Sequence, residues 1–257
     1  PKFYLKGLFN FCIPSYFYQK RFKHSIQSAR YDEHIMQRVN YYNKTAPFSL
    51  PDDAISINTF YKQEKRTTYF FDLLRYVKYF PKSFKLSYLF GDITHVPASP
   101  AIVKSRPIEN NDNSVLMKLN SVRHFIFVND NKRFEDKKDM AVWRGKCYVP
   151  HRKEFVQKFY RHPLCDIGQT NTRGDTNVAW QKKKLSLEKQ LDYKFLIAIE
   201  GNDVASNLKW AMSSNSLVMM SQPRYETWFM EGLLVANKHY VLLEDDYSDL
   251  EEKMQYY

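Results

Sequence analysis

The sequence predicts an α/β protein whose carboxyl-terminal half contains a parallel sheet. Three apolar runs of strand length, at residues 193–199, 216–220 and 239–243, alternate with segments of helical character. Strands that are apolar along their whole length and separated by helices are typical of a parallel sheet covered on both faces. Because crossovers between such strands are right-handed, this half is expected to be Rossmann-like.

The other elements of this half follow from caps and spacing. A strand is predicted at residues 140–144, ending at Gly145. Ser186 is expected to cap a short helix, and Ser248 with Glu251 three residues later forms a capping box for a final helix. Further helices are predicted at about residues 152–161, 204–214 and 225–233.

The amino-terminal half is rich in aromatic and basic residues and gives fewer signals. Residues 55–61 and 84–90 have the aromatic and aliphatic content of strands, and residues 68–80 have helical spacing. A loop-rich stretch with three prolines follows, and residues 123–128 (RHFIFV) are predicted as a buried strand.

Composition limits the possible classes of protein. A net charge of +11 and an isoelectric point near 9.3 favour anionic partners such as nucleic acid, anionic lipid or phosphorylated sugars. No run of about 18 apolar residues is present, so no transmembrane helix is expected. Cys12, Cys147 and Cys165 lack the spacing of a disulfide framework or a metal knuckle. They are expected to be free thiols, which favours a cytoplasmic protein.

Residues 3–22, FYLKGLFNFCIPSYFYQKRF, interleave aromatic rings with cations. The stretch fits a peripheral membrane contact, in which rings enter the headgroup layer and cations meet anionic lipid. It fits equally a helix that faces the core and exposes its lysines to solvent.

Basic residues follow the strand predicted at residues 140–144. In parallel sheets, ligands bind beyond the carboxyl ends of the strands, where helix amino termini offer unpaired amides. Arg144, Gly145 and Lys146 end this strand, and Arg152 begins the next helix. Guanidinium groups bind phosphate in bidentate fashion, so these residues can form a diphosphate clamp. A solvated basic turn is the alternative.

Two later turns are also candidates for a ligand site. Gly201 allows a tight turn, Asn202 or Asp203 can cap the next helix, and Ser206 and Lys209 can help to hold a phosphate. A well-capped helix without a ligand has the same composition. In residues 221–231, Glu226 or Glu231 can accept hydrogen bonds from a ribose, or the segment can be a helix that packs its aromatic face on the sheet.

These motifs together resemble glycosyltransferase family 90, which includes bacterial lipopolysaccharide core transferases and animal protein O-glucosyltransferases. The resemblance covers YKFLIAIEGNDVASNLKWAMSSNSLVMM, PRYETWFMEGLLVANKHYV and the upstream AVWRGK, and Gly91-Asp92 resembles the family's acidic motif. It implies a GT-B-like fold of two Rossmann-like lobes with an interlobe cleft. Residues 1–136 would bind the acceptor and residues 137–257 a UDP-sugar, with the last helix free to pack back on the first lobe.

The resemblance also assigns roles to residues. Asp92 matches the acceptor base, and the donor-binding positions are Arg144, Gly145, Lys146, Arg152, Gly201, Asn202, Asp203, Ser206, Lys209, Arg224 and Glu226. Lys146 and Lys209 depart from the serine and arginine of the animal enzymes, and both changes keep or add positive charge. No cofactor and no essential metal are implied. Glu244, Asp245 and Asp246 can attract a hard cation but are expected to be a solvated acidic end.

The predicted function is inverting transfer of a hexose, glucose or galactose, from a UDP-sugar to a lipopolysaccharide core sugar at the inner face of the membrane. Two alternatives remain at this stage. One is a protein O-glycosyltransferase of the same fold. The other is a non-enzymatic basic nucleic-acid-binding module, although no helix-turn-helix or RNP-like signature is present and no nucleic-acid partner is expected.

Overall fold

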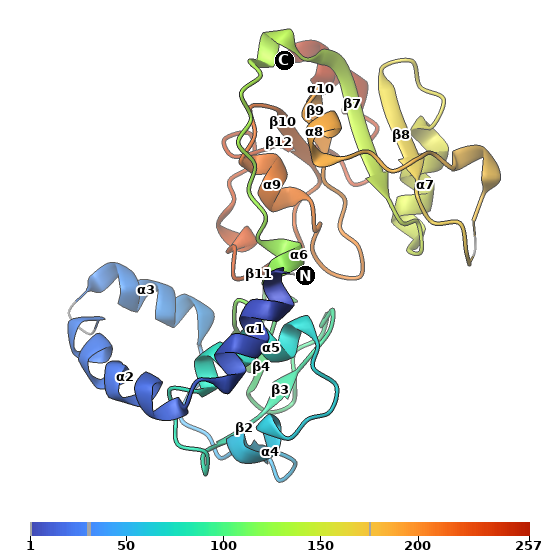
Figure 1. Ribbon diagram of the computed structural model, residues 1–257. Helices are drawn as coiled ribbons and strands as arrows, with labels where there is room; N and C mark the ends of the chain where they lie inside the picture. The colour runs from blue at the N-terminus through green and yellow to red at the C-terminus, as the bar shows by residue number, and fades with distance from the viewer. Residues whose placement is uncertain (1, 30–31, 175) are drawn as a thin grey trace. The chain divides into compact units, whose positions relative to one another are not determined.

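The computed structural model describes residues 2–29, 32–174 and 176–257, and the chain forms two compact units (Figure 1). The first unit comprises Pro1–Arg123 and Tyr225–Met230, and the second comprises His124–Arg224 and Glu231–Tyr257. The division expected at residues 136 and 137 therefore falls inside the second unit. The predicted boundary also assigned Tyr225–Met230 to the carboxyl-terminal lobe, whereas the structure includes this segment in the first unit.

A five-stranded sheet organises the second unit, with strand order β12-β10-β9-β7-β8. Its strands are β7 (Lys138–Gly145), β8 (Cys165–Gln169), β9 (Tyr193–Ile197), β10 (Leu217–Met220) and β12 (Val241–Leu242). Every pairing is parallel, which confirms the parallel sheet predicted from the sequence. Taken in chain order, the strands have the 2-1-3-4-5 arrangement of a flavodoxin-like doubly wound sheet.

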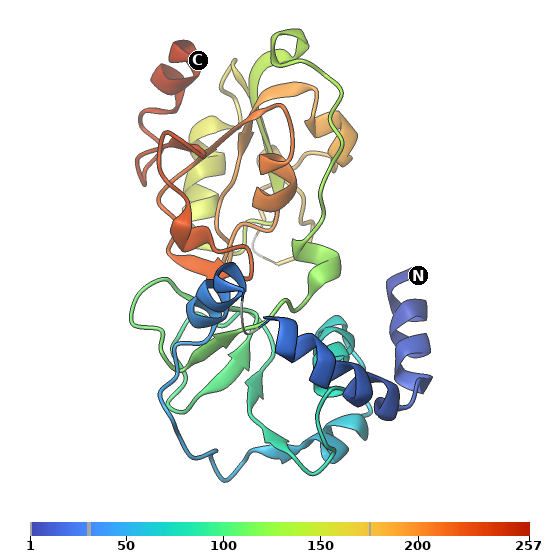
Figure 2. The same cartoon turned by 90° about the vertical axis from the view of Figure 1, so that its left-hand side faces the viewer.

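Both faces of this sheet are covered, which explains its continuous apolar strands. Alternate side chains along a strand point to opposite faces, and successive residues of β7 accordingly enter different core clusters. Trp143 packs with Phe155 of α7 (Pro150–Phe159), while Val142 packs in the cluster of α9 (Leu208–Met212). Figure 2 shows α7 in yellow-green and α9 in orange on different sides of the strands.

The last helix, α10 (Leu250–Tyr256), belongs to the second unit. Leu250 and Met254 enter the same core cluster as Phe155, so α10 packs on the sheet of this unit. Its N-cap is Asp249, whose side chain makes no capping bond to the helix, so the predicted Ser248 capping box is wrong. Ser186 does cap α8 (Leu187–Gln190), accepting a hydrogen bond from the amide of Lys189 as expected.

The first unit combines short strands with helices. A parallel sheet has the order β3-β4-β6, and two antiparallel pairs join β1 to β2 and β5 to β11. The strands are β1 (Ile55–Ser56), β2 (Lys85–Leu86), β3 (Tyr88–Leu89), β4 (Ala101–Val103), β5 (Ser105–Pro107), β6 (Ser114–Leu116) and β11 (Tyr225–Thr227). The α/β class is therefore observed in both units, although the described part of the first unit contains no doubly wound sheet.

Helices complete the first unit. They are α1 (Lys2–Cys12), α2 (Ser15–Ala29), α3 (Glu33–Tyr42), α4 (Ile57–Tyr61), α5 (Thr68–Val77) and α6 (Ser121–His124), the last of which ends at the unit boundary. The predicted helix at residues 68–80 corresponds to α5, which places Phe70, Leu73 and Leu74 in the core. Short 3-10 helices in the second unit span Phe134–Asp136, Val178–Trp180 and Glu231–Leu233.

Other predicted elements also differ from the structure. Residues 55–61 form a strand only at Ile55–Ser56, because the Ser56 hydroxyl accepts the amide of Thr59 and starts α4. Residues 123–128 continue from α6 into irregular chain and pair with no strand, and Phe127 is 60% exposed. The helix predicted at residues 225–233 is wrong, because Tyr225–Thr227 pairs with β5 as a strand.

Candidate functional site

The carboxyl ends of β7 and β9 lie at the switch point of the second unit's sheet. The chain leaves β7 toward β8 on one side, and later strands are added on the other side, starting with β9. Connections that diverge in this way leave a crevice at the carboxyl ends of the two central strands, and such crevices bind ligands in doubly wound sheets. The side chains of the turns after β7 and β9 therefore define the candidate site.

Arg152 joins these two turns. Its guanidinium donates hydrogen bonds to the carbonyl oxygens of Glu200 (2.8 Å, from Nε) and Ile199 (2.7 Å), which follow β9. It also donates to the carbonyl of Lys146 (3.2 Å), which follows β7, and its central carbon lies 5.6 Å from the Trp143 ring centre. Arg152 thus has a fixed position at the switch point, set by the backbone of two central strands.

The turn after β10 meets the turn after β9 through Glu200. The Glu200 carboxylate accepts from the amide of Arg224 (3.0 Å) and from its Nε (3.0 Å), while the Arg224 side chain stays 66% exposed. His151 Nε2 lies 2.8 Å from the Glu200 carbonyl oxygen. The edge of the sheet therefore carries two arginines and one carboxylate. Glu200 was not predicted as a site residue, although its place directly after the apolar run at residues 193–199 was a signal.

Tyr247 lies close to this group. Burial raises the pKa of Tyr247, and a hydrogen bond with Ser221 and the positive charges of Arg152 and Arg224 oppose that rise. The Tyr247 ring packs on Phe155 of α7, with 4.7 Å between the ring centres. Tyr247 was not anticipated from the sequence.

The glycines of these turns allow close packing. A Cβ atom on Gly145 would lie 2.3 Å from the Trp143 ring, so any side chain there would displace the indole. A Cβ atom on Gly201 would lie 3.2 Å from a terminal nitrogen of Arg152. Lys146 is exposed, and its Nζ lies 5.7 Å from the ring centre of Tyr148, which is also exposed. Gly201 therefore lies against the Arg152 guanidinium, whereas Gly145 lies against the Trp143 ring.

The turn after β9 is a loop rather than a helix terminus. The amide of Gly201 donates to the carbonyl of Asp203 (2.8 Å), Asp203 is buried, Asn202 is exposed and Ser206 is half-buried. Because α9 begins only at Leu208, neither Asn202 nor Asp203 is an N-cap, which corrects the helix predicted from residue 204. Asn207 instead ties the loop to β9 by donating to the Ile197 carbonyl (2.8 Å).

Two predicted phosphate ligands are held by carboxylates. Arg144 donates to Asp166 (2.7 Å), which also accepts from Lys182 (2.9 Å) and Tyr193 (2.8 Å). Although burial alone would raise the pKa of Asp166, the bonds from Lys182, Arg144 and Tyr193 hold it at about 2. Lys209 is enclosed and paired with the buried carboxylate of Glu231. A ligand phosphate would have to compete with these carboxylates for either cation.

Glu226 belongs to the first unit, whereas the turns after β7, β9 and β10, with which it was grouped as a donor-binding residue, belong to the second. Its carboxylate, 1% exposed, accepts from Nε of Arg106 (2.8 Å) and from the Tyr41 hydroxyl. Arg106 itself is fully buried. The side chain predicted to bind ribose therefore anchors β11 to β5 in the interior of the first unit.

Asp92 also belongs to the first unit and follows β3. Its side chain is 27% exposed, and its Oδ1 lies 2.5 Å from Nζ of Lys104, which is 1% exposed. This ion pair places a buried ammonium beside the carboxylate that the resemblance assigned as the acceptor base. Lys104 was not predicted as a partner of Asp92, although a lysine at the end of the apolar run at residues 101–104 was a signal of a buried charge.

Comparison with known proteins decides the family. Residues 115–257, more than half of the chain, match the model of glycosyl transferase family 90. The chain belongs to glycosyltransferase family 90. Among curated members, O-glucosyltransferase LpsA of Dichelobacter nodosus is 47% identical over 225 residues, which are 87% of this chain and 70% of that protein. The resemblance inferred from the motifs is confirmed, and the chain is a glycosyltransferase.

The span of the family 90 match divides the predicted site. The donor-side turns after β7, β9 and β10 all lie within residues 115–257, whereas Asp92 lies before them. The match also includes Glu226, whose structural role in the first unit is now clear. The matched range thus contains the donor-side turns and does not contain Asp92.

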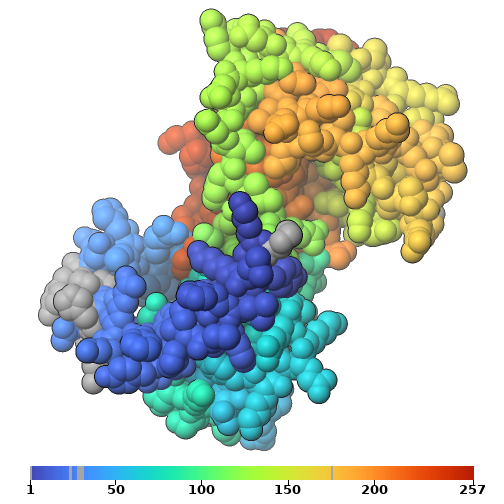
Figure 3. Space-filling view, in the orientation of Figure 1, coloured from blue at the N-terminus to red at the C-terminus, as the bar shows by residue number. Residues whose placement is uncertain are grey.

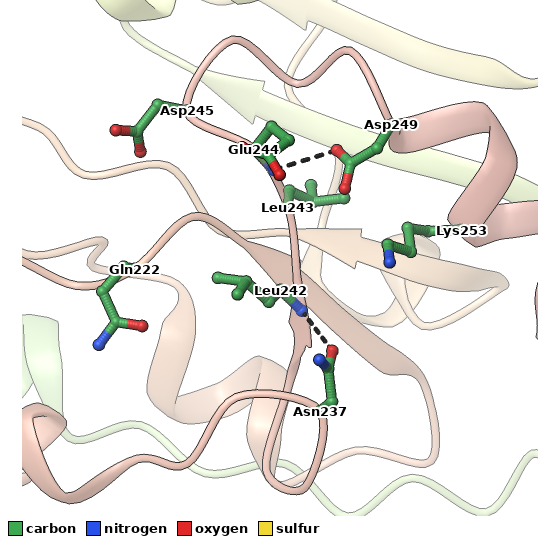
Figure 4. A pocket seen from close by; sticks show the side chains of 8 residues that line it. All are labelled: Gln222, Asn237, Leu242, Leu243, Glu244, Asp245, Asp249 and Lys253. Carbon is green, nitrogen blue, oxygen red and sulfur yellow. Dashed lines mark hydrogen bonds between the residues drawn. The ribbon is translucent and has the colours of Figure 1, made fainter.

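A surface cavity of about 260 Å³ lies beside the turn after β10 in this glycosyltransferase, lined in part by Gln222, Glu244 and Asp249 (Figure 4). The amide of Glu244 donates to Oδ1 of Asp249 (3.0 Å), and the Asp245 side chain points away from Asp249. Among the residues that the structure describes, no three His, Cys, Asp or Glu side chains converge as metal ligands would.

The buried thiols of the family 90 chain are poor nucleophiles at neutral pH. Burial raises the pKa of Cys147 to about 11 and that of Cys165 to about 12. The thiolate is the reactive form, so neither side chain suits covalent catalysis.

None of the helices in the described part of the chain combines the length and apolar character needed to span a bilayer.

Proposed function

We propose that this glycosyltransferase moves glucose from UDP-glucose to a hydroxyl group of a lipopolysaccharide core sugar, with inversion at the anomeric carbon. The observation that carries the proposal is the fixed position of Arg152 at the switch point, beside the exposed Arg224 and Lys146. The choice of glucose rests on the 47% identical relative, which is an O-glucosyltransferase. Family membership removes the non-enzymatic nucleic-acid-binding alternative.

In the proposed reaction, Asp92 accepts the proton of the acceptor hydroxyl as that oxygen attacks the anomeric carbon. The new carbon–oxygen bond forms on the face opposite the diphosphate, and the bond between the anomeric carbon and the diphosphate oxygen breaks. The leaving UDP gains negative charge as an oxocarbenium-like centre develops on the sugar. Arg152, Arg224 and Lys146 would stabilise that developing charge more than the ground state, which lowers the barrier.

An assay of acceptors and products tests the reaction. The protein is incubated with UDP-glucose or UDP-galactose and with either truncated lipopolysaccharide core or serine-containing peptides, and the new linkage is assigned by nuclear magnetic resonance. We expect a β-linked glucose on the core sugar, because inversion converts the α-linkage of the donor. Transfer to peptide alone would favour the protein O-glycosyltransferase alternative, and an α-linked product would contradict the inverting mechanism.

Arg152→Ala should weaken UDP binding by about thirtyfold, because a charged hydrogen-bond donor is worth about 2 kcal/mol. Calorimetric titration with UDP measures the change. Arg161→Ala is the matched control: it removes an exposed arginine just beyond the carboxyl end of α7 and should leave the affinity unchanged. Arg152→Lys separates charge from geometry and should give an intermediate affinity. Wild-type affinity in Arg152→Ala at full stability would exclude Arg152 as a diphosphate ligand.

A further inference from the structure

Helices α1 and α2 of the first unit are each packed on one face and exposed on the other. On α1, Gly7 lies against Phe71 of α5 so closely that a Cβ atom would be 2.6 Å from the ring. Phe3 and Phe11, on the same side of α1, pack against the core cluster of the first unit. The inward face of α1 is thus complementary to α5, and its orientation is fixed.

Lys78 strengthens this attachment. The residue is 1% exposed, and its ammonium donates to the carbonyl oxygens of Asn10 and Ile13 (2.5 Å) at the carboxyl end of α1. A cation at this end satisfies carbonyls that have no partner inside the helix and favours the helix dipole. Hence α1 is held by packing along its length and by charge at its end.

The inward face of α2 is equally well defined. The Tyr18 ring lies edge-on to Tyr79 (5.3 Å between centres), and Phe22 contacts both Tyr79 and Phe80. The Gln19 side chain donates to the carbonyl of Phe80 (3.0 Å). Residues 18, 19 and 22 share one side of the helix, so the residues on the opposite side are directed to solvent.

The outward faces carry large apolar side chains. Phe9 of α1 is 69% exposed and Phe17 of α2 is 63% exposed. Exposed cations accompany them on both helices, and no acidic residue precedes Asp32 in the chain. We call this region the α1–α2 surface: it consists of Lys2, Leu5, Lys6, Leu8, Phe9, Tyr16, Phe17, Lys20 and Arg21. Figure 3 shows the dark blue atoms of these helices as a continuous area.

We propose that the α1–α2 surface binds the anionic headgroup layer of a phospholipid bilayer. Aromatic and aliphatic side chains enter the interface, and lysine and arginine side chains beside them meet lipid phosphates. A positively charged surface of this kind is complementary to anionic lipid, and the absence of carboxylates removes the repulsion that such a membrane would otherwise meet. The inference goes beyond the transfer reaction and does not depend on it.

The structure also says how the contact would be made. Because α1 is fixed on α5 and by Lys78, and α2 is fixed on Tyr79 and Phe80, their apolar side chains would reach the membrane without refolding of the first unit. Neither helix is a candidate membrane span, so both would lie in the plane of the interface. Binding therefore orients the first unit against the layer from which a lipid-linked acceptor would be presented.

Vesicle co-sedimentation tests the proposal. The wild-type protein should bind vesicles that contain phosphatidylglycerol about tenfold more tightly than vesicles of phosphatidylcholine alone, and added salt should reduce that difference. The double variant Phe9→Ser/Phe17→Ser should bind the anionic vesicles about tenfold more weakly than wild type, because it removes two rings from the interface. Lys6→Glu/Arg21→Glu should lose the preference for anionic lipid.

Matched controls lie in the second unit. Phe127→Ser alters an equally exposed ring and Lys184→Glu an exposed lysine, and both variants should bind vesicles as wild type does. Circular dichroism of each variant confirms that it is folded. Wild-type vesicle binding by Phe9→Ser/Phe17→Ser would overturn the proposal. A concentration-dependent dimer that this variant abolishes would also overturn it, because the surface would then be an interface between copies of the chain.

Discussion

Asp92→Asn should lower the rate of sugar transfer by about a thousandfold while leaving the affinity for UDP unchanged. The asparagine side chain occupies the same space but cannot accept the proton of the attacking hydroxyl. UDP affinity is expected to stay constant because the basic turns proposed for the diphosphate belong to the second unit, whereas Asp92 belongs to the first. Initial rates with UDP-glucose and titration with UDP measure the two quantities separately.

Lys104 complicates this experiment and also supplies its control. Its ammonium is buried and paired with Asp92, so Asp92→Asn leaves a charge without its carboxylate and is expected to lower stability. The double variant Asp92→Asn/Lys104→Met removes both charges and should recover part of the thermal stability while remaining inactive. Recovery of transfer in the double variant would mean that Asp92 acts on the fold and is not the base. Asp112→Asn, at an exposed carboxylate of the same unit, should retain full activity.

The sheet of the second unit could be predicted because its signals are local. Residues 193–199 and 216–220 are apolar at all positions except Lys194 and Ser216, which reflects burial on both faces of a parallel sheet. The α7 helix was found for a related reason: its buried residues recur at helical spacing. In these segments the spacing of apolar residues along the chain matches the burial of the same residues in the fold.

The elements that were missed depend on distant partners. The aromatic content of residues 221–231 suggested a helix that covers a sheet, yet Tyr225–Thr227 pairs with β5. The buried ion pair between Arg106 and Glu226 joins residues 120 positions apart. Such a pairing overrides local propensity, and no spacing rule reports it. The short strands of the first unit were hard to assign for the same reason, since β1 and β2 have only two residues each.

The candidate site shows the same division. The positions of Arg152, Gly145 and Gly201 follow from the carboxyl ends of strands, and the structure brings Gly201 and Arg152 together. The sequence could not reveal that Arg144 is paired with Asp166 or Lys209 with Glu231, because each carboxylate lies 22 residues further along the chain and comes from another element. A basic residue at a strand end therefore indicates where a ligand site lies. Its side-chain partners decide whether its charge is available to bind phosphate.

Glu226→Gln should destabilise the protein by about 3–5 kcal/mol, because it leaves the guanidinium of Arg106 buried without its carboxylate. Arg106 is fully buried and also donates to the carbonyl oxygens of Tyr41 (2.7 Å) and Ser114 (2.8 Å), so its charge cannot move to solvent without disrupting the first unit. Urea unfolding measures the loss. Glu109→Gln, at an exposed glutamate of the same unit, should change the stability little.

The same variant separates the structural role of Glu226 from the donor-binding role inferred from the sequence. If Glu226 serves only to hold β11 against β5, UDP affinity stays at the wild-type value under conditions where the variant is folded. Replacing both members of the pair, as in Arg106→Met/Glu226→Met, should cost less stability than Glu226→Gln, because no unpaired charge remains in the interior. A fully stable Glu226→Gln protein with weakened UDP binding would restore the ribose contact and contradict the interior anchor.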